Sequence, residues 1–392
     1  MKSYQYVIVG GGMTADAAVA GIRELDQSNS IALVSEEKDP PYNRPPLSKG
    51  LWHNTPVEKI WRHTEERHVD LILGCKVVGV DPKNKMVTLE GGDKLQYEKL
   101  LLATGVQKRK LPFGGDQVLY FRTYQDYLLL NNLTQEKKKF AIIGSGFIGS
   151  ELAAALAQNG KEVTIFDVGP GIGWNVFPED LVGYLNHYYE ERQVKLFPNE
   201  KIVDIFGATR EITVKTESGK SLSFDGIVAG VGISPNISLA ESIGLEIENG
   251  IVVDEFARTS NQDIFSAGDV SNFFSLGLNQ RIRVEHADNA NVMGKLAGRN
   301  MAGANERYDY LPMFYSDLFD VGYEAVGLLN PSYEVFADWQ EKYIKGVLYY
   351  LKNDYVCGVL LWNVWDKVDS ARELISSRTT ISHKEELVGR IT

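Results

Sequence analysis

Two glycine-rich turns carry the clearest chemical signal in the sequence. Each follows an apolar run and opens an alanine-rich segment: residues 6–20 read YVIVGGGMTADAAVA and residues 140–154 read FAIIGSGFIGSELAA. In such a turn the first glycine permits the tight bend, the second lets the backbone approach a pyrophosphate, and the third small residue lets the helix pack on its strand. These positions are Gly10, Gly12 and Ala15 in the first copy and Gly144, Gly146 and Gly149 in the second. Each turn therefore predicts a dinucleotide site.

Each turn is followed by a second apolar run that ends near an acid. SIALVSEE contains Glu36, and EVTIFDV contains Asp167. A carboxylate at this place accepts hydrogen bonds from ribose hydroxyls and repels a 2′-phosphate. Because no Arg or Lys directly follows Asp167 to hold such a phosphate, the second site favours NADH over NADPH.

The elements that position these residues follow from the same pattern. The copies begin 134 residues apart, which is too long for a solenoid and fits two Rossmann-like α/β domains. Later segments are strand-rich, and residues 342–362 predict a hairpin that turns at 352–354. Residues 286–301 have the small-residue pattern of a packed helix, and 366–377 predict a C-terminal helix.

Two dinucleotide sites in one chain indicate one cofactor that is held and one that is exchanged. A flavin in one site and a nicotinamide in the other is the economical interpretation. The flavin would carry the chemistry, and the protein would orient and tune it.

The amino-acid composition limits the classes of partner that the chain is expected to bind. The chain has 392 residues, of which 52 are acidic and 41 basic, and the net charge of −11 disfavours nucleic acid and anionic membranes. No stretch approaches the roughly 20 apolar residues that span a bilayer. The sequence runs from its first residues directly into a predicted strand, so we expect a cytoplasmic protein. The histidines show no ligand spacing, so we expect no metal site.

Seven segments, in the expected order, resemble those of flavoprotein reductases that bind two dinucleotides. They are PPYNRPPLSKG (40–50), LLLATG (100–105), RKLPFGG (109–115), YFRTYQD (120–126), GSGFIGSELA (144–153), GVGISPN (230–236) and NQDIFSAGD (261–269). Within that group, VEHADNA (284–290) and PMFYSDLFDVGYEAVGLL (312–329) are most similar to the apoptosis-inducing factor family. The ferredoxin and rubredoxin reductases are next.

The resemblance implies a domain order. It places FAD on residues 1–110 and 237–309, with an NADH domain on 111–236 inserted between them. A C-terminal α+β domain on 310–392 follows, which in the family contributes to a dimer or partner surface. We therefore expect a homodimer.

The resemblance also implies the catalytic residues. Arg44 should neutralise the FAD pyrophosphate, and Lys49 should approach the isoalloxazine ring and pair with Glu151 near flavin N5. A lysine there stabilises the negative charge of reduced flavin; a solvated lysine and a helix N-terminal acid are the alternative. Glu285 and His286 should lie over the pyrimidine side of the flavin or the nicotinamide, with a core histidine as the alternative for His286. Lys49, Glu151 and His286 are the candidate catalytic residues.

Other matched motifs supply the remaining contacts. Asp269 should accept a hydrogen bond from the ribityl chain or cap a helix. Phe147 should gate the nicotinamide pocket and Tyr315 should lie near the flavin, with core packing as the alternative for both. The set is completed by Ala103, Thr104 and Gly105 for FAD and by Ile148 and Gly232 for NADH.

We interpret the chain as an FAD-dependent NADH:acceptor oxidoreductase. Hydride passes from NADH to flavin N5, and electrons then pass to an acceptor such as ferredoxin or rubredoxin. A slow, NADH-reduced redox switch like apoptosis-inducing factor, and a quinone or oxygen reductase, are the alternatives.

Cysteine and basic residues bear on the acceptor. Cys75 and Cys357 form no CxxC or CxxxxC pair and are predicted to be buried small hydrophobes, so disulfide and peroxide chemistry are disfavoured. An acidic carrier would need a basic docking face on this acidic chain. The candidates flank VEHADNA and are Arg281, Arg283, Lys295 and Arg299.

Overall fold

The computed structural model describes residues 2–208 and 211–391, which form two compact units. Unit 1 consists of Met1–Arg44, Val57–Gln107 and Ser234–Met313, and unit 2 of Pro45–Pro56, Lys108–Ile233 and Phe314–Thr392. Each unit contains one of the two glycine turns. The short segment Pro45–Pro56, which follows the first turn in sequence, groups with the second turn.

Unit 1 is built on a mixed sheet with the strand order β3-β2-β1-β6-β5-β4, and β18 pairs with β6. The strands around β1 are parallel, whereas β4 and β5 are antiparallel additions. The bounds are β1 Lys2–Val9, β2 Ile31–Val34, β3 Asp70–Ile72, β4 Val77–Asp81, β5 Met86–Leu89, β6 Lys94–Leu102 and β18 Ile264–Ser266. The first glycine turn thus starts at the carboxyl end of the central strand β1, where open parallel sheets bind ligands.

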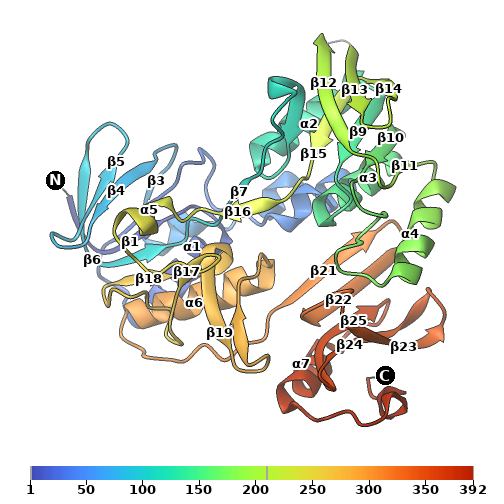
Figure 1. Cartoon of the computed structure of the whole chain (residues 1–392). Helices are drawn as coiled ribbons and strands as arrows, with labels where there is room; N and C mark the ends of the chain where they lie inside the picture. Colours follow the sequence, from blue (N-terminus) through green and yellow to red (C-terminus); the bar gives the residue numbers. More distant parts are fainter. Residues whose placement is uncertain (1, 209–210, 392) are drawn as a thin grey trace. The chain divides into compact units, whose positions relative to one another are not determined.

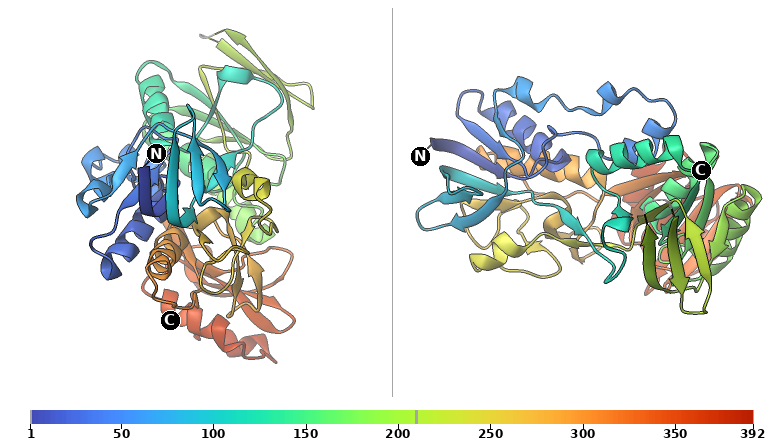
Figure 2. Two further views of the ribbon diagram at one scale, coloured as in Figure 1. Left: turned by 90° about the vertical axis from the view of Figure 1, so that its left-hand side faces the viewer. Right: turned by 90° about the horizontal axis from the view of Figure 1, so that it is seen from above.

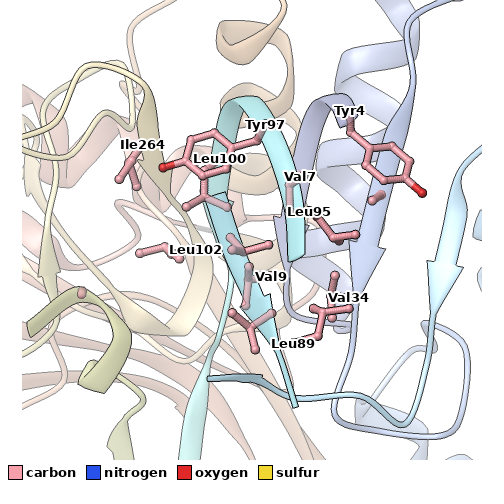
Figure 3. Close-up of a cluster of buried hydrophobic side chains, with 14 of the residues drawn as sticks. Tyr4, Val7, Val9, Val34, Leu89, Leu95, Tyr97, Leu100, Leu102 and Ile264 are labelled. Carbon is pink, nitrogen blue, oxygen red and sulfur yellow. The ribbon is translucent and has the colours of Figure 1, made fainter. Parts of the chain in front are cut away.

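The central strands of this sheet are buried, which explains their nearly continuous apolar runs. Val7 and Val9 of β1 pack beside Leu100 and Leu102 of β6, with Ile264 of β18 next to them (Figure 3). All five side chains are at most 5 % exposed. This cluster fixes the end of β1 from which the glycine turn begins.

Helices α1 (Met13–Leu25) and α6 (Ala287–Met301) lie side by side in unit 1 (Figure 1). A Cβ at Gly298 would lie 2.0 Å from the carbonyl oxygen of Ala18, and one at Gly21 would lie 2.1 Å from that of Lys295. The helices therefore approach so closely that only glycine fits at these positions. The packed helix predicted over 286–301 is confirmed.

A buried carboxylate ties the segment after β2 to α1. Asp16, 2 % exposed, lies 2.6 Å from Arg62 Nε and 2.8 Å from an Arg67 guanidinium nitrogen, and it accepts a hydrogen bond from Thr64 Oγ1. The neighbouring bridge between Tyr42 and Trp61 belongs to the same segment. These contacts hold the backbone that leads into Arg44.

Unit 2 contains a parallel sheet, in the order β11-β10-β9-β15-β8, and an antiparallel sheet β12-β13-β14. Buried side chains of both sheets, among them Phe166, Ile205, Val214 and Ile227, form one cluster. The bounds are β8 Val118–Tyr120, β9 Lys139–Ile143, β10 Glu162–Phe166, β11 Lys195–Phe197, β12 Ile202–Ala208, β13 Glu211–Thr216, β14 Ser221–Phe224 and β15 Gly226–Ala229. Its helices are α2 Tyr124–Glu136, α3 Phe147–Gln158 and α4 Glu179–Glu191.

The C-terminal part of unit 2 is a five-stranded sheet, orange to red in Figure 2, in the order β21-β22-β25-β24-β23, and helix α7 packs on β22 and β25. The bounds are β21 Met313–Leu318, β22 Val321–Gly327, β23 Glu334–Glu341, β24 Lys345–Lys352, β25 Tyr355–Trp362 and α7 Val368–Ser377. The predicted hairpin and C-terminal helix are confirmed. The hairpin turns through Asn353 and Asp354, both with positive φ.

The remaining elements are short. They are β7 Val106–Lys108, β16 Ile233–Pro235, β17 Ile251–Val252, β19 Ser271–Ser275, β20 Gln280–Ile282, α5 Ser238–Ser242, and the 3-10 turns η1 Pro45–Leu47, η2 Gly50–Trp52, η3 Val57–Ile60, η4 Thr64–Arg67, η5 Gly115–Gln117, η6 Gly268–Val270 and η7 Lys384–Leu387. Within the described part of the chain, no helix combines the length and apolar character needed to cross a membrane.

The close approach of α1 and α6 predicts opposite effects of the same substitution at two helical glycines. Gly298→Ala should lower the free energy of unfolding by about 1–3 kcal/mol, because the added methyl group overlaps the backbone of α1. Gly183→Ala in α4 is the matched control, since no atom lies within 4 Å of its added Cβ, and it should raise stability by about 0.5–1 kcal/mol. Urea unfolding of both variants measures the difference, and stabilisation by both would contradict the packing argument.

Candidate functional site

The first glycine turn leaves the backbone of α1 open to an anion. Gly10 directly follows β1 with φ +128°, and a Cβ there would lie 2.1 Å from the carbonyl oxygen of Ala103. Gly12 caps α1, and the nearest atom to a Cβ at Gly12 is a guanidinium nitrogen of Arg44, at 3.9 Å. The positive end of a helix and an arginine therefore meet at the same turn, which fits the pyrophosphate of FAD.

Arg44 is held by an acid that the sequence analysis did not select. Its guanidinium forms an ion pair with Glu37, whose other oxygen accepts a hydrogen bond from Tyr42 Oη at 2.6 Å. Burial acts to lower the pKa of Arg44, but the charges at Tyr42, Glu37 and Asp269 together raise it. The predicted ribose acid, Glu36, is exposed, with an oxygen 3.4 Å from Lys76 Nζ, and its ribose contact stays a prediction. Because Glu36 and Glu37 are adjacent in sequence, the sequence alone could not show which of them pairs with Arg44.

The ATG and SPN motifs join each other in unit 1. Thr104 Oγ1 donates to the carbonyl oxygen of Asn236, and Asn236 Nδ2 donates to that of Thr104, each at 2.8 Å. The backbone amide of Asn236 also donates a hydrogen bond to the carbonyl oxygen of Gly105, which has φ +63°. Asn236 therefore fixes the predicted residues Thr104 and Gly105 beside Ala103, a role that the sequence analysis did not assign to it.

The N-terminus of α6 gathers three further predicted residues. Arg283 donates to the carbonyl oxygen of Asp269 at 3.0 Å and forms an ion pair with Glu285 at 2.6 Å. His286 occupies the N-cap position of α6, and burial lowers its pKa to about 4. The imidazole is therefore neutral near pH 7, so it can orient a ligand by hydrogen bonding but supplies no positive charge.

The second glycine turn has the same design in unit 2. A Cβ at Gly144, where φ is +93°, would lie 2.5 Å from the carbonyl oxygen of Gly230, and one at Gly149 would lie 1.9 Å from that of Gly144. At Gly146, which caps α3, a Cβ would meet no atom within 4 Å. The turn is thus tight toward the sheet and open at the helix end, which fits the pyrophosphate of a nicotinamide dinucleotide. The predicted residues Phe147 and Ile148 are exposed at this end.

Asp167 holds this turn in place. Its carboxylate accepts hydrogen bonds from the amide and hydroxyl of Ser145, at 2.5 and 2.7 Å, and from the amide of Gly169 at 2.6 Å. The next side chain, Val168, is 68 % exposed. The predicted Gly232 lies two residues after Gly230, has φ +96°, and its carbonyl oxygen accepts a hydrogen bond from the backbone amide of Arg109.

Lys49, Glu151 and Tyr315 come together within unit 2. Lys49 Nζ lies 2.6 Å from Glu151 Oε1 and 5.5 Å from the centre of the Tyr315 ring. The side chains of Lys49 and Glu151 are 15 % and 3 % exposed. The alternative of a solvated lysine is therefore wrong, because a buried ion pair with an aromatic neighbour takes its place.

Two serines missed by the sequence analysis complete this cluster. Ser48 Oγ donates to Glu151 Oε2 at 2.5 Å, and Ser316 Oγ donates to Glu151 Oε1 at 2.6 Å. Both are buried. Their only signal in the sequence is their position next to Lys49 and Tyr315.

The four basic residues proposed for docking are engaged within unit 1. Lys295 and Arg299 pair with Glu24, Arg299 also pairs with Glu306, and Arg283 pairs with Glu285. Arg281 donates to backbone carbonyl groups. These cations therefore do not form a face of uncompensated positive charge.

The two cysteines of the chain form no disulfide with each other. Cys75 and Cys357 are free thiols that are half-buried, so they are less buried than the predicted small hydrophobes of a core, although Cys75 packs against the core of unit 1. Burial raises the pKa of Cys357 to about 11, which keeps it a thiol. Among residues 2–208 and 211–391, no cluster of three His, Cys, Asp or Glu side chains could hold a metal ion.

Comparison with known proteins gives matches over nearly the whole chain. The family model "pyridine nucleotide-disulphide oxidoreductase" matches residues 4–294, and the C-terminal model of mitochondrion-associated apoptosis-inducing factor matches 297–342 and 336–377. Apoptosis-inducing factor 1 of Dictyostelium discoideum is 32 % identical, over 99 % of this chain and 81 % of its own.

Two further matches are reductases of electron carriers. The ferredoxin–NAD(+) reductase component of the anthranilate 1,2-dioxygenase system of Burkholderia cepacia is 32 % identical, over 84 % of this chain and 83 % of its own. In the solved covalent putidaredoxin reductase–putidaredoxin complex, a chain that is 26 % identical superposes with a TM-score of 0.89, covering 97 % of this chain and 94 % of that one.

Burial of His286 predicts a defined pH dependence of stability. The folded pKa of about 4 lies below the ordinary value of 6.5, so the unfolded chain binds a proton between these values and the folded chain does not. The contribution of neutral His286 is therefore present above pH 6.5 and is lost as pH falls toward 4. His286→Gln should reduce the loss of unfolding free energy between pH 7 and pH 5 by about 2 kcal/mol.

Urea unfolding at a series of pH values measures this effect. His187→Gln is the control, because His187 is exposed on α4. If both variants flatten the pH dependence equally, burial of His286 is not its cause.

Proposed function

The chain belongs to the pyridine nucleotide-disulphide oxidoreductase family, and from this premise we propose that it oxidises NADH and passes the electrons to a small iron–sulfur protein. It is an FAD-dependent NAD(P)H oxidoreductase. The family and the α/β fold class predicted from the sequence are therefore confirmed. The proposal adds to this activity the transfer of electrons to a carrier protein of ferredoxin or rubredoxin type.

The observation that carries the proposal is the buried pair of Lys49 and Glu151. A bound flavin takes up the hydride of the nicotinamide and releases electrons afterwards. In the proposed role, Lys49 offers a fixed positive charge to the negative charge that reduction creates. Glu151 holds that ammonium group in one orientation, because its carboxylate lies 2.6 Å away in a site that is almost entirely buried.

We assign the two glycine turns to the two cofactors. The first turn, with Arg44 beside it, takes the FAD pyrophosphate, and Glu36 takes the ribose. Thr104, Asp269 and His286 complete this site. The second turn takes the pyrophosphate of NADH, with Phe147 at its open end.

The acceptor is proposed from the relatives and from what the chain lacks. Two of the matches named above are a ferredoxin–NAD(+) reductase component and a putidaredoxin reductase in complex with putidaredoxin. No cysteine occurs in residues 40–50, where the disulfide reductases carry theirs. The C-terminal match to apoptosis-inducing factor favours the second candidate, a slow redox switch that NADH reduces. The homodimer, the cytoplasmic location and the domain ranges stay predictions.

Turnover with candidate carriers tests the proposal. With NADH and a ferredoxin or rubredoxin, we expect a turnover number on the order of 10 per second, a typical enzymatic value. Anaerobic stopped-flow spectroscopy of flavin absorbance, followed by addition of carrier or air, measures it. Slow reoxidation by every carrier and by air would favour the switch, whereas fast reoxidation by oxygen or a quinone alone would make the protein a direct reductase of that acceptor.

The preference for NADH is tested at the end of β10. We expect kcat/KM for NADH to exceed that for NADPH by about tenfold or more, because Asp167 repels a 2′-phosphate and no base follows it. Val168→Arg should raise kcat/KM for NADPH by offering the phosphate a partner at an exposed position. Val203→Arg, at another exposed valine of unit 2, is the control. A wild-type preference for NADPH would refute the assignment.

A further inference from the structure

We propose that Ser316 and Ser48 are positioning residues that orient Lys49 through Glu151, so that the C-terminal sheet completes the hydride-transfer site. The inference rests on the proposed function of the pair Lys49–Glu151. Neither serine has to touch a cofactor in this role.

The geometry around Glu151 carries the inference. Three donors reach one buried carboxylate: Lys49 Nζ and Ser316 Oγ meet Oε1, each at 2.6 Å, and Ser48 Oγ meets Oε2 at 2.5 Å. Lysine is a donor only, and ionised carboxylates are acceptors only, so this arrangement is the one an ionised Glu151 requires. Ser48 gives Oε2 a donor, which the lysine does not reach in this contact.

The two serine hydroxyls also fix the orientation of the Glu151 carboxylate and, through it, that of the Lys49 ammonium group. An ammonium group on a flexible stem has no preferred orientation of its own. The carboxylate plane of Glu151 is set by Ser48 on one oxygen and by Ser316 on the other, and the lysine follows the carboxylate. Loss of one hydroxyl would leave a buried charge with fewer hydrogen bonds and a freer plane.

Strand β21 places Ser316 by simple alternation. Ser316 and Leu318 are each 1 % exposed, whereas Tyr315, between Phe314 and Ser316, is 43 % exposed. Because side chains alternate along a strand, Ser316 reaches Glu151 while Tyr315 presents its ring to Lys49. One short strand therefore provides contacts to both members of the ion pair.

A second carboxylate, that of Asp317, explains why Glu151 needs the two serine hydroxyls. Asp317 also lies within electrostatic reach of Lys49, and its pKa is raised mainly by desolvation and also by Glu151, while Lys49 and His53 act to lower it. Lys49 thus has two carboxylates within its field. The two serine hydroxyls favour Glu151 as the partner, because they compensate its charge and not that of Asp317.

A double-mutant cycle on the FAD-loaded protein tests the inference. Ser316→Ala should slow flavin reduction by NADH about tenfold with little change in the Kd for NADH, the effect of one lost hydrogen bond to a charged group. It should also make the midpoint potential of the bound flavin more negative, because a disordered lysine stabilises the reduced form less. Ser316→Thr, which restores a hydroxyl, should recover most of both effects, and Ser332→Ala, at an exposed turn of the same unit, should change neither.

The background Glu151→Gln decides between the hypotheses. If Ser316 acts through Glu151, adding Ser316→Ala to the Glu151→Gln variant should change the rate of flavin reduction by less than twofold. The midpoint potential of the bound flavin should then be almost unchanged. An equally large effect in both backgrounds, or unchanged rate and potential in Ser316→Ala alone, would overturn the positioning role. If Glu151→Gln and Lys49→Met themselves leave reduction by NADH unchanged, the proposed function of the pair fails, and the serines are structural.

Discussion

The burial of one carboxylate, Glu151, constrains three distant parts of the chain. A charge removed from water is costly unless it is paired and hydrogen-bonded. The partners of Glu151 come from the loop at residues 48–49 and from strand β21, more than a hundred residues away on either side. The second Rossmann-like sheet, the loop after the first turn and the C-terminal sheet must therefore assemble correctly before this group is satisfied. Unit 2 is organised around that requirement.

Local patterns explain why so much of the fold could be predicted. The glycine turns require a positive φ or a close approach at defined positions, so their spacing predicts strand, turn and helix together. Gly10 and Gly144 have these backbone angles, and Gly298 and Gly21 allow the contact between α1 and α6. The hairpin β24–β25 and helix α7 follow in the same way from strand-forming runs, turn residues and helical periodicity.

Features that depend on which side chains meet in the folded chain could not be predicted. Glu36 and Glu37 are adjacent acids, and only the fold shows that Glu37 holds Arg44 while Glu36 meets solvent. The serines beside Lys49 and Tyr315 look like ordinary loop and strand residues until their hydroxyls meet Glu151. The degree of burial of Cys75 and Cys357 was wrong for the same reason, since an apolar run does not show how completely its neighbours cover it.

The pairing of basic residues changes what the net charge of −11 means for a partner. A basic residue whose charge is matched by a neighbouring carboxylate contributes little to the field at long range. Glu24 and Glu306 together neutralise Lys295 and Arg299 in this way, so the excess acid of the chain is not offset by a positive patch at these residues. Recognition of an acidic carrier at these residues would then depend on short-range contacts rather than on electrostatic steering. Such contacts include apolar packing and hydrogen bonds made after encounter, and they affect dissociation more than association.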